Sequence, residues 1–213
     1  MIDASLVSDR VAALRDELRS IAGRDIAVVA VTKALGRDAV DAAAAAGCDA
    51  VGENYAQEVL AKVADGPLPL PLHFIGAIQS NKVRQLAPHV GLWQGVERDS
   101  VVDEIAKRAP GARILLQVNT TGEGSKAGIA PDLVGPMRDR AVAAGLAVEG
   151  LMTIGPTDGP AADVRRAFSS LRTLADGLGL RECSMGMSSD WRIAAECGST
   201  MVRVGTMLFG PRR

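Results

Sequence analysis

Aromatic residues, cysteines and histidines are all scarce in this chain of 213 residues. Phe, Trp and Tyr make up 3% of the sequence, which is too few for a base-stacking surface. The three cysteines, Cys48, Cys183 and Cys197, are far apart and lack Cys-x-x-Cys spacing, and only two histidines accompany them. A disulfide framework and a Cys/His metal site are therefore both disfavoured, and we expect no metal.

An excess of charge of one sign is also missing. The formal net charge is -1 and the sequence pI is about 6.1, so there is no basic surface for nucleic acid or for an anionic membrane. No apolar run reaches membrane-spanning length, and the first residues lack the basic and apolar regions of a secretory signal. We expect a cytoplasmic protein with neither a nucleic-acid nor a membrane partner.

No linker rich in Pro, Gly or Ser and no block of like charge divides the chain, whose length allows one sizeable core. We predict one domain over residues 1–213, and we expect a monomer. Apolar residues recur at helical spacing from Asp3 to Ile21, and Gly23 ends the pattern. An amphipathic helix is therefore expected before the first strand.

Short apolar runs then alternate with helical stretches. The predicted strands lie near residues 26–32, 49–52, 72–76, 91–96, 112–118, 147–151, 181–185 and 200–204. The predicted helices lie around residues 37–46, 54–64, 80–87, 99–109, 131–144, 160–177 and 189–197. This order indicates a parallel α/β sheet covered by helices, and eight strands fit a closed (β/α)8 barrel of the TIM type. The alternative is an open doubly wound sheet, but the turn at residues 32–36 lacks the Gly-x-Gly-x-x-Gly motif of dinucleotide sites.

Lys33 stands at the end of the apolar run from Ile26 to Thr32. A charged side chain is rarely placed at the end of so apolar a strand unless something pairs with it or removes its charge. A partly desolvated lysine loses its proton more readily and can form a Schiff base with an aldehyde, so Lys33 is a candidate for holding pyridoxal phosphate. The alternative is a lysine that opens a surface loop.

The loops after the last two strands contain residues suited to a phosphate, and barrels commonly bind phosphate there. Ser188 and Ser189 can cap a helix that begins near Asp190 while donating to phosphate, Gly205 lets the backbone approach an anion, and Thr206 adds a hydroxyl. The alternative is an ordinary helix cap at residues 188–190 and a turn at Gly205. A Schiff-base lysine and a phosphate site at one barrel mouth together point to pyridoxal phosphate.

Arg203 lies within an otherwise apolar strand, where an unpaired guanidinium is costly. If Arg203 donates to a pyridine nitrogen, that nitrogen stays unprotonated, because arginine keeps its own proton. The ring is then a weak electron sink, which argues against transaminase chemistry. The alternative is a structural ion pair of Arg203 with Glu53 or Glu149 inside the barrel.

Several ordered blocks carry a more specific signal: residues 30–33 (AVTK), 52–58 (GENYAQE), 73–76 (HFIG), 79–82 (QSNK), 118–119 (VN), 126–128 (KAG), 150–152 (GLM), 184–190 (SMGMSSD) and 198–206 (GSTMVRVGT). Together they resemble the pyridoxal-phosphate homeostasis proteins, stand-alone barrels similar to the N-terminal domain of bacterial alanine racemase. The resemblance spans nearly the whole chain. The chain departs from the family pattern at residues 76–79, and at Ser189, where an acidic residue is common.

The resemblance implies that pyridoxal phosphate is the cofactor. Lys33 would form the internal aldimine and Arg203 would face the pyridine nitrogen, while other residues hold the phosphate or line the pocket. The positions that the resemblance assigns to cofactor binding are Lys33, Asn54, Met187, Ser188, Arg203, Gly205 and Thr206.

Catalysis of racemisation needs a second acid or base, which the alanine racemases resembled here supply as a tyrosine from an additional β-domain. The only tyrosine of this chain is Tyr55, after the second predicted strand, and the chain ends at Arg213. With no second base identified, we expect a non-catalytic protein that buffers or delivers pyridoxal phosphate in intracellular vitamin B6 homeostasis. Its expected partners are the cofactor and apo-enzymes that use it.

Two other functions remain open from the sequence. One is a low-activity amino-acid racemase that uses the same cofactor, and the other is an aldolase-like barrel with a Schiff-base lysine and a phosphorylated substrate. Lys82 and Lys126 lie on loops at the barrel mouth and are candidates for accepting the cofactor transiently. The alternative is that both are solvated, with Lys126 balanced by Glu123.

Overall fold

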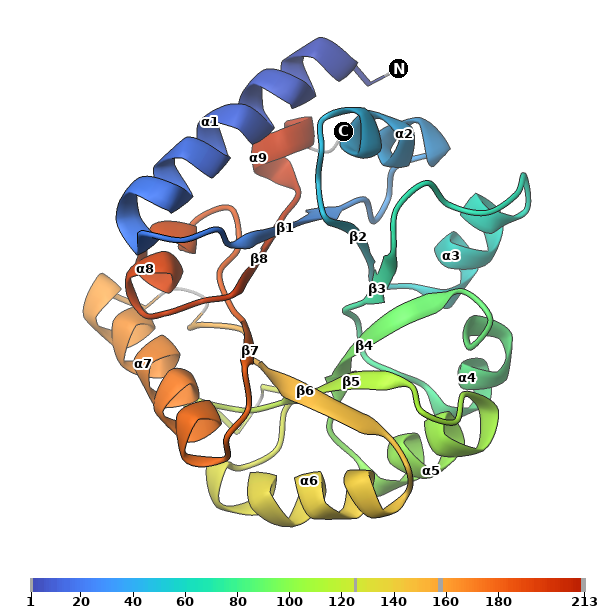
Figure 1. Ribbon diagram of the computed structural model, residues 1–213, viewed down its shortest axis with the longest axis vertical. Helices are drawn as coiled ribbons and strands as arrows, with labels where there is room; N and C mark the ends of the chain where they lie inside the picture. Colours follow the sequence, from blue (N-terminus) through green and yellow to red (C-terminus); the bar gives the residue numbers. More distant parts are fainter. Residues whose placement is uncertain (1, 125, 157–158, 212–213) are drawn as a thin grey trace.

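The strands of the computed structural model form one closed parallel sheet, in which each strand pairs with the next and the last pairs with the first (Figure 1). They are β1 (Ala27–Val31), β2 (Ala50–Glu53), β3 (Leu72–Phe74), β4 (Val90–Val96), β5 (Arg113–Gln117), β6 (Ala147–Met152), β7 (Glu182–Ser184) and β8 (Met201–Val204). The structure describes residues 2–124, 126–156 and 159–211, so Met1 and Arg213, the ends of the predicted domain, lie outside it. The predicted (β/α)8 barrel is confirmed, and the open doubly wound sheet is wrong.

Helices surround the barrel, and those that lie between the first and last strands in the sequence connect successive strands (Figure 1). The helices are α1 (Ala4–Ala22), α2 (Arg37–Ala45), α3 (Ala56–Val63), α4 (Ser80–Leu86), α5 (Asp99–Arg108), α6 (Val134–Ala143), α7 (Ala161–Gly177), α8 (Trp191–Glu196) and α9 (Thr206–Phe209). The predicted helices match α2 to α8, except that the helix expected from residue 131 starts with a separate 3-10 turn, η1 (Pro131–Leu133). No prediction corresponds to α9, because four residues are too few to show a helical repeat.

Helix α1 is the expected additional helix before the first strand. The Asp3 side chain accepts a hydrogen bond from the Leu6 amide at its start, and Gly23 ends it with a φ of 66°, which a glycine adopts without strain. One face, with Val7, Val11, Leu14 and Leu18, is buried. Helix α1 packs against α2, α8 and α9, and so covers the place where β1 meets β8.

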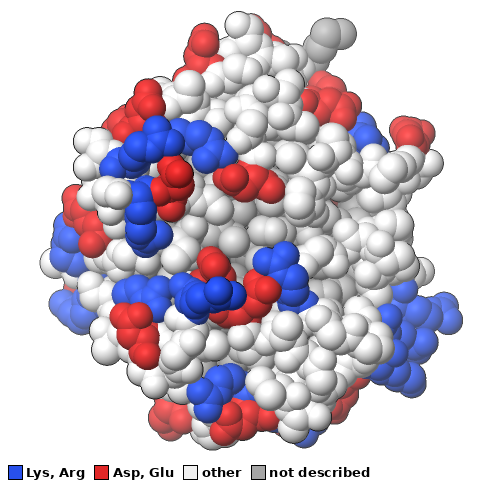
Figure 2. Space-filling model, viewed as in Figure 1, with Lys and Arg blue, Asp and Glu red and all other residues white. Residues whose placement is uncertain are grey.

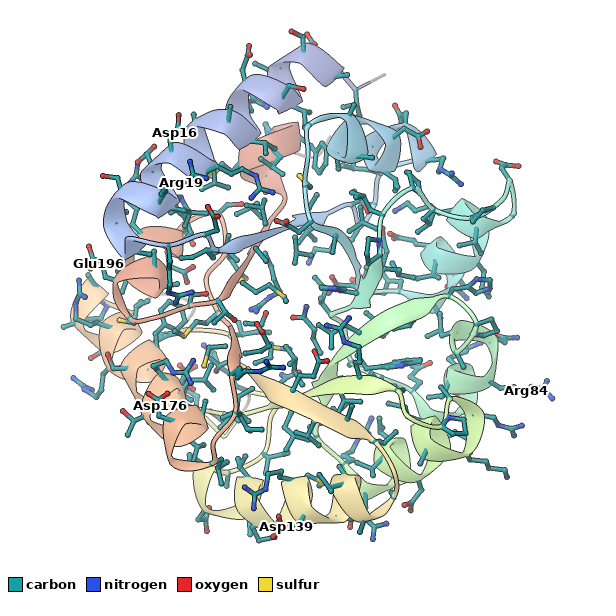
Figure 3. All side chains as sticks on the ribbon, viewed as in Figure 1. Asp16, Arg19, Arg84, Asp139, Asp176 and Glu196 are labelled. Atoms are coloured by element: carbon teal, nitrogen blue, oxygen red, sulfur yellow. The ribbon has the colours of Figure 1, made fainter. Side chains whose placement is uncertain are left out.

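Side chains fill the interior of the barrel, as Figure 3 shows, whereas the labelled charged residues such as Asp16, Arg84 and Asp139 lie on its outside. Successive strand residues point to opposite faces. One interior layer is apolar and is formed by Val29, Ala50, Leu92, Leu115, Met152 and Met201. In β1 the alternation that places Val29 in this layer continues through Val31 to Lys33, so Lys33 follows the inward-facing side of the strand.

The barrel interior also holds a chain of hydrogen bonds between side chains of four strands. Arg203 NH1 donates to Ser184 Oγ (2.6 Å), and Ser184 Oγ donates to Gln94 Oε1 (2.7 Å). The Gln94 Nε2 atom then donates to His73 Nδ1 (2.9 Å), so His73 is neutral and has its proton on Nε2. We call these four residues the interior chain.

The surface shown in Figure 2 has a mixed charge, because many of the basic side chains in its central part lie beside acidic ones. Two ion pairs join residues near the amino-terminal ends of strands, namely Arg15 with Asp49 (2.8 Å) and Arg113 with Glu149 (2.6 Å). Among the described residues, no helix is both long and apolar enough to cross a membrane.

The buried His73 makes the stability of the fold depend on pH. Burial and, to a smaller extent, the positive charge of Arg113 lower the pKa of His73 from 6.5 to about 4. Between pH 6.5 and pH 4 the His73 side chain is therefore protonated in the unfolded chain but not in the folded protein. The free energy of unfolding has its full value above pH 6.5 and decreases as the pH falls toward 4. We expect the loss to total roughly 3 kcal/mol. In His73→Gln this part of the pH dependence disappears, as measured by urea unfolding at pH 7 and at pH 4.5.

The exposed His89 provides the matched control. His89→Gln should lose stability between the two pH values as the unsubstituted protein does. Equal pH dependence in His73→Gln and in the control would contradict the assignment.

Candidate functional site

A cavity of about 420 Å³ opens at the carboxyl ends of the barrel strands. All seven residues selected from the sequence line it, namely Lys33, Asn54, Met187, Ser188, Arg203, Gly205 and Thr206. The rest of its wall is mostly apolar and contains Val31, Ile75, Met152, Ile154 and Ser189. Three other cavities, of about 500, 510 and 560 Å³, are larger, but none of them is lined by Lys33 or Arg203. The mouth of the barrel thus brings together residues from the first, second, seventh and eighth strand-to-helix loops.

Lys33 is half-buried and begins a tight turn after β1. The next residue, Ala34, has a φ of 60°, in the left-handed region that residues other than glycine rarely adopt. Glu58 on α3 accepts a hydrogen bond from the Ala34 amide (2.7 Å), and the Leu35 amide donates to the Thr32 carbonyl (3.1 Å). These bonds hold the strained residue and so fix where the Lys33 side chain leaves the backbone.

A buried ion pair supports the other side of the same turn. Lys62 and Glu53 are 4% and 0% exposed and form a short contact between Lys62 Nζ and Glu53 Oε1. Lys62 also donates to the Thr32 carbonyl (2.7 Å), and the Thr32 hydroxyl donates to Glu53 Oε1 (2.5 Å). Burial raises the pKa of Glu53, and the hydrogen bonds from Lys62 and Thr32 oppose that rise. Charged groups from β2 and α3 therefore hold the peptide units on both sides of Lys33.

Sequence reasoning did not select Lys62. Lys62 follows the buried Val59 by three residues, so both lie on the inner face of α3. This helical spacing is the sequence feature that could have indicated a buried lysine. A buried lysine requires an anionic partner, but the sequence does not show which carboxylate reaches it.

Arg203 is 5% exposed, and its side chain is held by uncharged acceptors. Its NH1 donates to Ser184 Oγ and its NH2 donates to the Thr153 carbonyl (2.8 Å). Burial lowers the pKa of Arg203 to about 10, against the opposing charge of Asp190, so the guanidinium stays charged at neutral pH. None of the ion pairs formed by the described residues includes Arg203.

The alternative that Arg203 pairs with Glu53 or Glu149 is wrong. Glu53 is used by Lys62 and Thr32, and Glu149 accepts two hydrogen bonds from Arg113 at 2.6 and 2.8 Å. Charge complementarity along the sequence pointed to these carboxylates, but each is already neutralised by a nearer cation.

In another part of the cavity wall, Ser188 connects the loop after β7 with the start of α9. Its Oγ accepts hydrogen bonds from the Gly205 amide (3.4 Å) and the Met207 amide (3.3 Å). The alternative of an ordinary helix cap does not hold at Asp190, because this cap residue of α8 makes no side-chain cap bond there. Its carboxylate accepts from the Met187 amide instead (2.6 Å). Backbone donors and hydroxyl groups thus gather where the loop after β7 meets the start of α9.

Asn54 and the neighbouring loops complete the mouth. The Asn54 Oδ1 atom is buried and has no hydrogen-bond partner within the described part of the chain. A Cβ atom at Gly76 would lie 2.2 Å from the Asn54 carbonyl, so only glycine permits this approach. Lys82 and Tyr55 line the adjoining cavity with Asn54 rather than the cavity of Lys33.

Lys126 makes definite contacts on the other side of the mouth. Its Nζ donates to the Gly155 carbonyl (2.6 Å) and lies 3.3 Å from Glu123. The alternative in which Glu123 balances Lys126 is therefore confirmed for the ion pair, but the Lys126 side chain is 15% exposed and is not a solvated charge. The neighbouring Ser125 lies outside the described residues.

Comparison with known proteins shows which family has a similar sequence. The family model described as "Alanine racemase, N-terminal domain" matches residues 8–213. The pyridoxal phosphate homeostasis protein of Pseudomonas aeruginosa is 42% identical over 215 residues, which cover 95% of this chain and 93% of that protein.

Solved structures agree with the fold. PipY of Synechococcus elongatus, solved with PLP bound, has 33% identity and a TM-score of 0.84, and the match covers 96% of this chain and all of that one. Alanine racemase from Corynebacterium glutamicum has 17% identity and a TM-score of 0.78, with 99% of this chain and 62% of that chain covered. The second likeness concerns the fold alone.

We expect Lys62→Met to destabilise the protein by about 3 to 5 kcal/mol, because the substitution leaves the Glu53 carboxylate buried without its cation. Urea unfolding at neutral pH measures the loss. Lys107→Met, at an exposed position of α5, is the matched control and should change stability little. The double variant Glu53→Gln/Lys62→Met should recover part of the loss. Equal stabilities of the two single variants would show that the buried pair lacks this role.

Proposed function

The chain belongs to the family of the alanine racemase N-terminal domain and the pyridoxal phosphate homeostasis proteins, and we propose that it binds pyridoxal phosphate and buffers or delivers it. One observation carries this proposal. A single cavity combines a lysine at a strand end, a buried guanidinium and a group of hydroxyl and amide donors. The names and the bound PLP of the similar proteins support it.

The cavity fits the cofactor in size and in chemistry. Its volume of about 420 Å³ lies within the range of about 300 to 1,000 Å³ that is usual for small-molecule sites. The orphaned Asn54 Oδ1 atom is a polar group at the wall that a ligand can satisfy. Apolar side chains such as Val31, Ile75 and Met152 offer surface to the faces of an aromatic ring.

Each predicted residue has a distinct task in this proposal. Lys33 holds the cofactor, whose aldehyde condenses with the neutral lysine amine to give a C=N bond and one water. Arg203 donates to the ring nitrogen, which it keeps unprotonated. The phosphate is held by Ser188, Gly205 and Thr206, where the Ser188 hydroxyl and the first amides of α9 meet. Asn54 and Met187 line the pocket.

The same residues favour a carrier over an enzyme. An unprotonated ring nitrogen withdraws fewer electrons, so the cofactor would assist carbanion chemistry less. Tyr55, the only tyrosine in the sequence, is 56% exposed and lines the adjoining cavity, away from Lys33. Two-base catalysis at an amino-acid Cα would need a second group that these residues do not supply. Release of the cofactor to apo-enzymes in the cell is the use that such a site favours.

Reconstitution with pyridoxal phosphate tests the linkage. The purified protein should acquire a visible absorbance band, and Lys33→Ala should lack it, because the imine chromophore forms on that amine. Lys82→Ala is the matched control, since Lys82 lines only the adjoining cavity, and its band should be unchanged. A band that survives in Lys33→Ala would move the linkage to another lysine, and no band in either protein would overturn the proposal.

Exchange of the α-proton of alanine in deuterated water tests the carrier role. We expect the loaded protein to exchange this proton no faster than free pyridoxal phosphate at the same concentration, because no second base is in place. Proton NMR of the alanine Cα signal measures the rate. Exchange that exceeds the free cofactor severalfold, and that Tyr55→Phe abolishes, would establish a racemase-like activity instead.

A further inference from the structure

The described residues include two buried cations, Lys62 and Arg203, which are held differently. Lys62 is neutralised by the Glu53 carboxylate, whereas the hydrogen-bond acceptors of Arg203 in the described part of the chain are the Ser184 hydroxyl and the Thr153 carbonyl. Uncharged acceptors compensate a buried charge less than a carboxylate does, and their geometry decides where the guanidinium points. The position of Arg203 therefore depends on these two hydrogen bonds.

The hydrogen bonds of the interior chain have only one consistent set of directions. Arginine can only donate, so Ser184 Oγ must accept from Arg203 and must give its own proton to Gln94 Oε1. The Gln94 amide then turns its Nε2 toward His73, whose Nδ1 accepts. Ser184 and Gln94 are 0% exposed, so water does not replace either partner. Gln94 thus fixes the orientation of the Ser184 hydroxyl, and Ser184 fixes the orientation of the Arg203 guanidinium.

Ser184 and Gln94 do not line the cavity, but Arg203 does. The hydrogen bonds to Ser184 and Thr153 use two of the five N–H groups of the guanidinium, and a ligand in the cavity can meet the remaining donors. Without Ser184 Oγ, a single bond to Thr153 would remain, and the guanidinium could turn about it toward the Asp190 carboxylate, which already attracts its charge. The donor would then no longer point at a fixed place in the cavity.

We propose that Ser184 and Gln94 are positioning residues, which hold Arg203 so that the site selects a ligand with a ring nitrogen at that place. The inference rests on the proposed function, since the ring is that of pyridoxal phosphate. It predicts a specific defect: loss of Ser184 weakens recognition of the ring nitrogen, while recognition of the aldehyde and the phosphate is retained.

The experiment compares pyridoxal phosphate with its 1-deaza analogue, in which a C–H replaces the ring nitrogen and the aldehyde and phosphate are kept. Equilibrium binding of each compound gives a dissociation constant, and the ratio of the two constants isolates the ring nitrogen. We expect the unsubstituted protein to favour pyridoxal phosphate by about tenfold or more, the effect of a hydrogen bond from a charged donor. In Ser184→Ala this preference should fall at least about threefold, because the donor is no longer held in place.

Ser199→Ala is the matched control. Ser199 is also 0% exposed, but its hydroxyl contacts backbone carbonyls, such as that of Met185 (2.8 Å), and makes no hydrogen bond with Arg203. A merely structural effect of losing a buried hydroxyl should appear in both variants and should weaken both ligands alike. Gln94→Met is the second test variant, since it keeps Ser184 but removes the acceptor of its proton, and it should lower the preference in the same direction.

The outcomes separate the two proposals. An unsubstituted protein that binds neither compound overturns both the proposed function and this inference. Binding of pyridoxal phosphate with an unchanged preference in Ser184→Ala and Gln94→Met overturns the inference alone. An equal fall in Ser199→Ala also overturns it, whereas a fall confined to the interior-chain variants supports it.

Discussion

The pairing of β1 with β8 is the constraint on which the site depends. In this parallel register Val29 lies opposite Arg203 and Ala30 lies opposite Val204, although these residues are far apart in the sequence. The pairing closes the barrel and places Lys33, two residues beyond the end of β1, beside the loop that follows β8. An open sheet would leave these two strands at unrelated positions. The cavity is therefore a product of closure, and no single βα unit contains it.

The barrel and the residues at its mouth were largely predictable from the sequence. The alternation of short apolar runs with helical stretches specifies a parallel barrel, since only the order and number of elements are needed. Lys33 and Arg203 stood out because each is a single charge at or within an apolar strand. Ser188, Gly205 and Thr206 followed from their place after the last two strands. Their location in one cavity agrees with that reasoning, whereas their roles toward a cofactor remain proposals.

The partners of the buried charges were not predictable in the same way. The alternative for Arg203 was a carboxylate partner, but its hydrogen-bond acceptors in the structure are Ser184 and Thr153. Ser184 and Gln94 lie 90 positions apart and meet only because β7 and β4 face each other across the barrel. Lys62 was missed for the same reason, since its contacts depend on how α3 seats against the turn after β1. Strand register and helix packing determine which of several possible residues becomes the partner of a buried charge. The spacing of residues in the sequence reveals neither the register nor the packing.

Barrel closure also determines when the site can form during synthesis. Residues 201–204 of β8 leave the ribosome long after β1, because synthesis proceeds from the amino terminus at roughly 5 to 20 residues per second. Until β8 docks, β1 has an unpaired edge, and the interior chain lacks Arg203. A growing chain therefore has Lys33 without the guanidinium, the hydroxyl groups or the first turn of α9 that complete the cavity. Specific capture of a ligand there thus requires β8 as well as β1, and it reports that the first and last strands of the barrel have joined.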